Sequence, residues 1–180
     1  TASPTGNNWP SDWARTDSSD VTAASSKFHV STTVGEKYAW YAATTLATPL
    51  IVPGAWYEVT LTRSVTARSA GAATVDLIWL DIDGTIVRTD VLSTTSTTDA
   101  SPVDLTLYPR AKAPAHAARA RVRVGAGVGA NLTADFYSVV LRRCPLRLIV
   151  VAEDAVGALA SYAHPVHLNV KYSPRYEIAR

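Results

Sequence analysis

The stretch LIWLDIDGTIV, residues 77–87, decides the fold because two apolar runs flank a single Asp-Gly pair. Asp83 and Gly84 between alternating apolar segments are a strong signal for a tight turn, since glycine tolerates the positive φ that such turns need. The pattern therefore predicts an antiparallel hairpin whose turn lies at Gly84.

The same alternation of apolar and polar residues recurs on both sides of this hairpin. Alternation with a period of two, broken by Gly, Pro, Ser and Asp, is typical of β-strands and their turns. The predicted strands cover residues 26–33, 37–46, 57–65, 74–82, 85–92, 103–108, 118–124 and 133–142. Because no long helical pattern separates them, the fold class is predicted to be all-β, an antiparallel two-sheet sandwich or jelly roll with extended terminal arms.

The pattern also divides the chain into three parts. Residues 1–25 are rich in Ser, Thr, Asp and Asn and lack periodicity, so they are predicted to form an N-terminal arm. Residues 26–144 are predicted to form the sandwich, and residues 145–180 a C-terminal assembly arm. Two further strands expected at 146–152 and 166–172 would leave an uncovered sheet edge, which predicts a homo-oligomer.

Basic residues are concentrated in one part of the chain. Residues 110–147 hold eight Lys or Arg and one acidic residue, although the whole chain has a net charge of only +2. Alternation places Arg119, Arg121 and Arg123 in a row on one strand face, either as an assembly surface that binds anionic groups or as an exposed face paired with neighbouring carboxylates. With such a low overall charge, nucleic acid is not an expected partner.

Asp81 and Asp83 also resemble the DxDGT motif of haloacid-dehalogenase-like phosphatases, in which the first Asp attacks phosphorus and the second transfers the proton. That resemblance implies a parallel sheet with helical crossovers, and the residues after Arg88 have the pattern of strands and loops instead. The phosphatase remains an alternative. The prediction is that the chain is not an enzyme, with no catalytic residues and no cofactors.

Four segments in order resemble the carbohydrate-binding-module-like jelly rolls of bacterial glycosidases and of actinobacteriophage minor tail proteins. They are ATPLIVPGAWYEVTLTRSV (47–65), ATVDLIWLDIDGTIV (73–87), YPRAKAPAHAARARVRV (108–124) and ADFYSVVLRR (134–143). The shared features are a Pro-Gly-x-x-Tyr turn, a hairpin at the end of a Trp-containing strand, an Ala-Pro-x-x-Ala loop and a closing Asp-x-x-x-Val-x-Leu strand. The resemblance covers roughly residues 37–143 and implies the jelly-roll fold.

In sugar-binding members of this group, exposed aromatic side chains stack on pyranose rings. The residues to which the resemblance assigns this role are Trp40, Trp79 and Tyr41. Some members hold a structural calcium ion through a carboxylate that corresponds to Asp135. No metal is expected here, because one matched carboxylate does not supply the six to eight oxygens that calcium requires.

The first residues of the sequence show no export signal, and no run reaches the roughly 20 apolar residues of a membrane span. We therefore expect a non-catalytic phage virion structural protein, made in the host cytoplasm and located in the virion as a minor tail or other virion-surface protein. Its expected partners are copies of itself, other virion proteins and host cell-surface polysaccharide, with no membrane partner. The alternatives are a capsid decoration protein and a secreted glycan-binding module.

Overall fold

The computed structural model describes residues 9, 10, 12–41, 51–99, 101–109 and 112–144, together with the backbone of two short strands at 151–153 and 159–161. The chain divides into two compact units, Thr1–Cys144 and Pro145–Arg180. In the described part of the chain, no helix has the length and hydropathy needed to cross a membrane.

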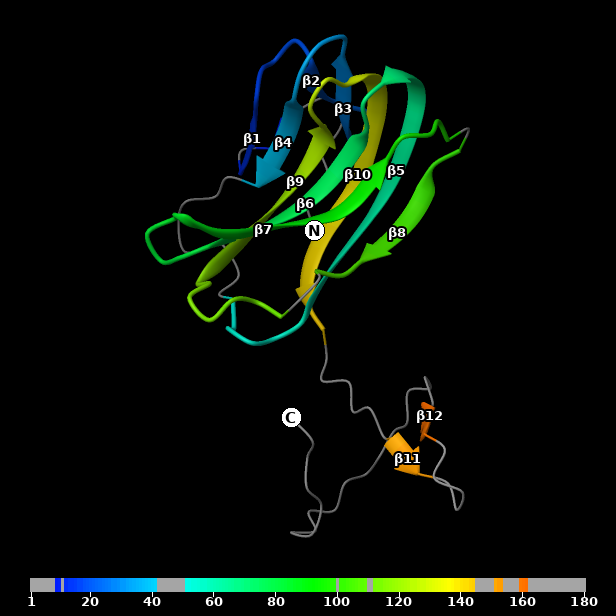
Figure 1. Ribbon diagram of the computed structural model, residues 1–180. Helices are drawn as coiled ribbons and strands as arrows, with labels where there is room; N and C mark the ends of the chain where they lie inside the picture. Colours follow the sequence, from blue (N-terminus) through cyan, green and yellow to red (C-terminus); the bar gives the residue numbers. More distant parts are fainter. Residues whose placement is uncertain are drawn as a thin grey trace. The chain divides into compact units, whose positions relative to one another are not determined.

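The first unit consists of two five-stranded antiparallel sheets that form two layers (Figure 1). The first sheet has the order β1 (Trp13–Arg15), β4 (Lys37–Tyr41), β9 (Arg119–Ala126), β6 (Ala73–Leu80) and β7 (Ile86–Thr95). The second has the order β2 (Val21–Ala24), β3 (Lys27–Thr32), β10 (Asn131–Arg143), β5 (Tyr57–Ala70) and β8 (Val103–Leu107). The predicted all-β antiparallel sandwich is therefore confirmed.

The core lies between the two sheets and follows the alternation of the sequence. Side chains that point inward from both sheets, among them Phe28, Leu77, Trp79 and Phe136, are completely buried. Trp79 of the first sheet meets Tyr57 of the second edge to face, with ring centroids 5.6 Å apart. Such burial of large apolar side chains is the main stabilising contribution in a domain of this size.

The predicted hairpin is formed by β6 and β7. The Asp81 carboxylate accepts hydrogen bonds from the backbone N–H groups of Asp83 at 3.0 Å and Thr85 at 2.7 Å, and Gly84 has a φ of 87°. Asp81 thus holds the turn, and Gly84 supplies its positive φ. Because β6 pairs antiparallel with both β7 and β9, the parallel sheet required by the phosphatase alternative is absent from the described strands, and that alternative is wrong for this fold.

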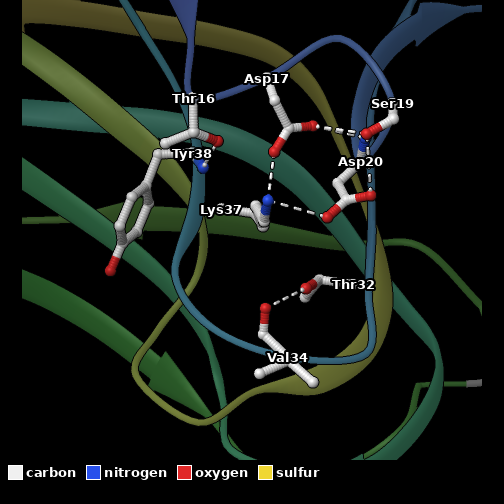
Figure 2. A network of polar contacts seen from close by, with 8 residues as sticks. All are labelled: Thr16, Asp17, Ser19, Asp20, Thr32, Val34, Lys37 and Tyr38. Carbon is white, nitrogen blue, oxygen red and sulfur yellow. Dashed lines mark hydrogen bonds and ion pairs between the residues drawn. The ribbon is translucent and has the colours of Figure 1, made fainter.

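The N-terminal arm predicted over residues 1–25 is corrected by the structure. Within it, residues 13–15 form β1 of the first sheet and residues 21–24 form β2 of the second, so these residues belong to the sandwich, whereas residues 1–8 and 11 lie outside the described residues. Figure 2 shows what holds the connection between β1 and β2: Lys37 binds the carboxylates of Asp17 and Asp20, and the backbone N–H of Tyr38 donates to the Thr16 hydroxyl at 3.1 Å. The polar composition that suggested an arm is used in these contacts.

The contacts of Lys37 predict how the stability of the protein changes at acid pH. The pKa of Asp17 is lowered to about 2 from its usual 3.8, chiefly by the hydrogen bond from Lys37. A carboxyl whose pKa is depressed on folding stabilises the protein above its unfolded pKa, and this contribution is lost as the pH falls from 3.8 through about 2. Thermal unfolding followed between these pH values should therefore show a weaker pH dependence in Lys37→Met than in the unaltered protein.

Lys112→Met, a change at an exposed lysine, is the matched control and should retain the original pH dependence. Parallel pH profiles for the unaltered protein and Lys37→Met would contradict this role of the Asp17 pair.

The eight predicted strands correspond to β3 through β10, with ends that shift by a few residues. The longest difference is at β5, which continues to Ala70. Residues 42–46 of the predicted strand 37–46 lie outside the described residues.

In the second unit, β11 (Val151–Glu153) pairs antiparallel with β12 (Leu159–Ser161). The predicted strand 146–152 overlaps β11, and the predicted strand 166–172 lies outside the described residues. The assembly role of residues 145–180 stays a prediction.

Candidate functional site: the arginine face

The outer surface of the first sheet brings together two groups of residues that were predicted separately. On β9, the inward side chains of Ala120, Val122 and Val124 belong to the core, so the alternate residues Arg119, Arg121 and Arg123 point outward. On β4, Ala39 belongs to the core, and Trp40 lies on the outer side directly opposite Arg123 in the strand register. We call this surface the arginine face; its residues are Tyr38, Trp40, Asp76, Arg119, Arg121 and Arg123.

Arg123 is fixed by a buried carboxylate and an aromatic ring. Asp76 on β6, only 2% exposed, accepts hydrogen bonds from Nε of Arg123 at 2.8 Å and pairs with its Nη2 at 2.7 Å. The guanidinium carbon lies 4.2 Å from the centroid of the Tyr38 ring, within the range of a cation–π contact. For Arg123, the alternative of an ordinary cross-strand ion pair is therefore correct.

Burial and the charge of Arg123 act on the pKa of the Asp76 carboxyl in opposite directions. Burial raises the pKa of Asp76, and the hydrogen bond and positive charge of Arg123 oppose that rise. The pair is thus a fixed array of polar groups, and the half-buried Trp40 lies opposite Arg123 in the strand register.

Arg121 differs from its neighbour because no carboxylate of the described residues pairs with it. Its partner across β6 is Ile78, and its Nε is buried without a hydrogen-bond partner. Burial and the nearby charge of Arg123 lower the pKa of the Arg121 guanidinium. An arginine nevertheless stays charged at neutral pH, so this half-buried cation retains hydrogen-bonding capacity.

Apolar side chains form the floor of the arginine face. Ile78 and Leu80 point away from the core on β6, yet they are only 3% and 8% exposed.

Tyr38 lies against β9 at Gly125, where an added Cβ would come within 2.1 Å of the Lys37 carbonyl oxygen and 2.8 Å of the Tyr38 ring. Glycine at position 125 therefore permits the close approach that sets Tyr38 beside Arg123.

Two of the predicted sugar-stacking residues lie elsewhere. Trp79 is completely buried, and its Nε1–H donates to Asp90 at 2.7 Å, so it has no ring surface for a ligand. Tyr41 follows Trp40 and thus points to the core side of β4, where its ring meets Trp13 at a centroid distance of 6.0 Å. The assignment of Trp79 is wrong because alternation shows that a strand has two faces without showing which face is open. The assignment of Tyr41, which is half-buried, stays a prediction.

Asp135 lies on the second sheet and does not fit the calcium site implied by the resemblance. One carboxylate oxygen contacts Lys27 Nζ at 2.5 Å, and the other contacts His29 Nδ1 at 2.7 Å. Both oxygens are thus used by basic groups, whereas calcium requires several oxygen ligands. Within the described ranges, no group of three or more His, Cys, Asp or Glu side chains is placed to hold a metal ion.

A shallow depression of about 360 Å³ lies at the ends of β3, β5 and β10 on the second sheet. Its lining consists of Ser31, Thr32, Thr33, Ala67, Arg68, Ser69, Asn131, Leu132 and Thr133. The lining contains no aromatic side chain. The arginine face, which combines an aromatic platform with fixed polar groups, is therefore the better candidate for a binding site.

Asp76 was not predicted as a site residue, although the sequence contains an indication of its role. An acidic residue inside the apolar run VDLIWL of β6 requires a cation when it is buried. The Arg row on β9 is the obvious source of that cation once the two strands are paired.

No family model matches the chain, and no curated protein matches it in sequence. Solved structures do resemble it. An arabinose-bound α-L-arabinofuranosidase, MgGH51, matches over 78% of this chain with a TM-score of 0.53 and 15% identity. The CBM22-1 and GH10 modules of Clostridium thermocellum endo-1,4-β-D-xylanase 10B, complexed with xylohexaose, match over 73% with a TM-score of 0.51 and 12% identity.

A third similar structure is a single module, the C-terminal family 22 carbohydrate binding module of the same Clostridium thermocellum xylanase. It matches 74% of this chain and 86% of its own length, with a TM-score of 0.50 and 20% identity. The chain has the β-sandwich fold of carbohydrate-binding modules. It spans about a quarter of the length of the first two proteins, 25% and 26%. At these identities the likeness concerns the fold alone.

Proposed function

We propose that the sandwich of residues 1–144 is a non-catalytic glycan-binding module and that the arginine face is its binding surface. The observation that carries this proposal is the position of Trp40 directly opposite Arg123, which is itself fixed by Asp76. A pyranose ring has an apolar C–H face and a rim of hydroxyl groups. Trp40 offers a flat platform for the former, and the fixed charged groups offer hydrogen bonds to the latter.

Pre-organisation supports this assignment. Asp76 and Tyr38 hold Arg123 in place before any ligand arrives. Groups that are already fixed lose less conformational entropy on binding than free surface arginines would.

The fold likeness supports the same proposal. One of the similar structures contains a family 22 module in a protein complexed with xylohexaose, and another is a family 22 carbohydrate binding module studied for ligand binding in its cleft. Among the functions expected from the sequence, the glycan-binding module is thus favoured over the virion protein.

Affinity electrophoresis of the full chain in gels that contain soluble xylan, β-glucan, polygalacturonate or alginate tests the proposal. At least one polysaccharide should retard the protein, and Trp40→Ala should weaken that binding about tenfold or more, since a stacked ring contributes on the order of 1.5 kcal/mol. Tyr137→Ala is the matched control, because Tyr137 is a half-buried aromatic residue on the second sheet.

Retardation by none of these polysaccharides would contradict the proposal. So would a loss of binding in Tyr137→Ala with full binding in Trp40→Ala, which would place the site on the second sheet.

The virion role, the capsid decoration alternative and self-association through residues 145–180 stay predictions. The same module could serve either a secreted protein or a virion surface, because both functions require only a glycan-binding face. Proteomics of purified phage particles distinguishes the two settings.

A further inference from the structure

We infer that the arginine face selects glycans that carry carboxylate groups, with Arg121 as the residue that pairs with a uronate. This inference rests on the proposed function and specifies its ligand class. It starts from the contrast between two arginines on the same strand face, one with a carboxylate partner and one without.

Arg121 is the unsatisfied member of the row. Its Nε is buried and has no hydrogen-bond partner, and no carboxylate of the described residues pairs with it. A buried donor without a partner costs on the order of 1–3 kcal/mol. The Arg121 side chain as a whole is only half-buried, so the accessible part of its guanidinium can meet a ligand carboxylate, whose two oxygens match the guanidinium fork.

The acidic residues near the arginine face cannot take this role. Asp76 already pairs with Arg123 through both Nε and Nη2. Glu36 directly precedes Lys37, which pairs with Ala126, five positions along β9 from Arg121. Glu36 is one position further along, so at about 3.3 Å per residue it lies roughly 20 Å from Arg121 along the strand direction.

The ligand that fits is a glycan rather than an acidic protein surface, because the Arg121 cation lies near an aromatic side chain that can stack on a sugar ring. Two residues along β9, Arg123 lies opposite Trp40 in the strand register, so a platform for a sugar and a site for its carboxylate are about 7 Å apart along the strand. One uronate-containing chain could contact both groups. The apolar floor of Ile78 and Leu80 also limits access of water to the ion pair, which strengthens it.

The experiment compares polysaccharides that differ only in charge. Polygalacturonate, alginate and glucuronoxylan are each used before and after carboxyl reduction, which converts the carboxylate into a neutral CH2OH group and leaves the backbone unchanged. Isothermal titration of the full chain should show binding to at least one native polymer about tenfold tighter than to its reduced form, a preference that decreases at about 0.5 M salt.

Arg121→Gln should remove this preference while the affinity for the reduced polymer stays the same. Arg121→Lys keeps the positive charge but loses the paired N–H donors of the guanidinium. It should therefore retain only part of the preference for the native polymer. The matched control is Arg142→Gln, which removes one positive charge from the second sheet, where Arg142 is paired with Glu58. It should retain the full preference.

Equal affinity for the native and reduced polymers would overturn the inference and leave the proposed glycan-binding function standing. Failure to bind either form would count against both. Equal losses in Arg121→Gln and Arg142→Gln, or equally tight binding to dextran sulfate, would show attraction by net charge alone and would also overturn the inference. Binding of an acidic protein in place of any polyuronate would assign the face to a protein partner.

Discussion

Replacing Trp79 by alanine is expected to lower the free energy of unfolding by about 4 kcal/mol. The side chain is completely buried between the sheets and packs against Tyr57. Its removal would create a large cavity and would leave Asp90, which is 5% exposed, without the hydrogen bond from the Trp79 indole. Urea denaturation at constant slope m measures this loss.

Trp56→Ala is the control, since Trp56 is 46% exposed and the same truncation should cost less than about 1 kcal/mol there. If Trp79→Ala instead unfolded at the original urea concentration and lost glycan binding, Trp79 would be a ligand residue.

Replacing Arg123 by methionine is expected to lower the free energy of unfolding by about 2–3 kcal/mol near neutral pH. Removal of one partner of a buried ion pair leaves an uncompensated charge, here the 2% exposed carboxylate of Asp76. The expected value lies below the usual range because the Arg123 side chain is 30% exposed, so water already screens the pair.

This loss should depend on pH in a defined direction. Burial already raises the pKa of Asp76, and loss of Arg123 would raise it further. A carboxyl with a raised pKa in the folded state opposes folding while it is ionised, and that penalty disappears as the pH falls and the group becomes protonated. The stability deficit of Arg123→Met should therefore be smaller at about pH 4 than at about pH 7.

Arg121→Met is the control for the Arg123 variant, because it makes the same change at an arginine with no carboxylate partner among the described residues. It should show no comparable deficit. Equal deficits in both variants, or a deficit for Arg123→Met that does not change with pH, would contradict the assigned roles of Asp76 and Arg123.

Most of the fold could be predicted from the sequence because period-two alternation with Gly and Pro breaks is a local signal. It predicts β3 to β10 and the turn at Gly84. The short strands β1 and β2 could not be found this way, since three or four residues are too few for a period to appear. They depend on long-range contacts, including those of Lys37 with Asp17 and Asp20.

The binding face could be predicted only in part. The row of Arg119, Arg121 and Arg123 follows directly from alternation on β9, where the intervening residues are small or apolar. On β6 both faces are buried, so the run VDLIWL gives no indication that Trp79 points inward and Asp76 outward. The pairing of Asp76 with Arg123 depends on the strand order, which local sequence does not determine.

The central claim, that the arginine face binds a glycan, is tested most directly by an NMR titration of the full chain with hexagalacturonate and with xylohexaose. The claim predicts that at least one of them shifts the side-chain N–H signals of Trp40, Arg121 and Arg123, while Ser31 and Thr133 in the depression of the second sheet stay unchanged. Shifts confined to Ser31, Thr133 and their neighbours, or no shifts with either oligosaccharide, would contradict it.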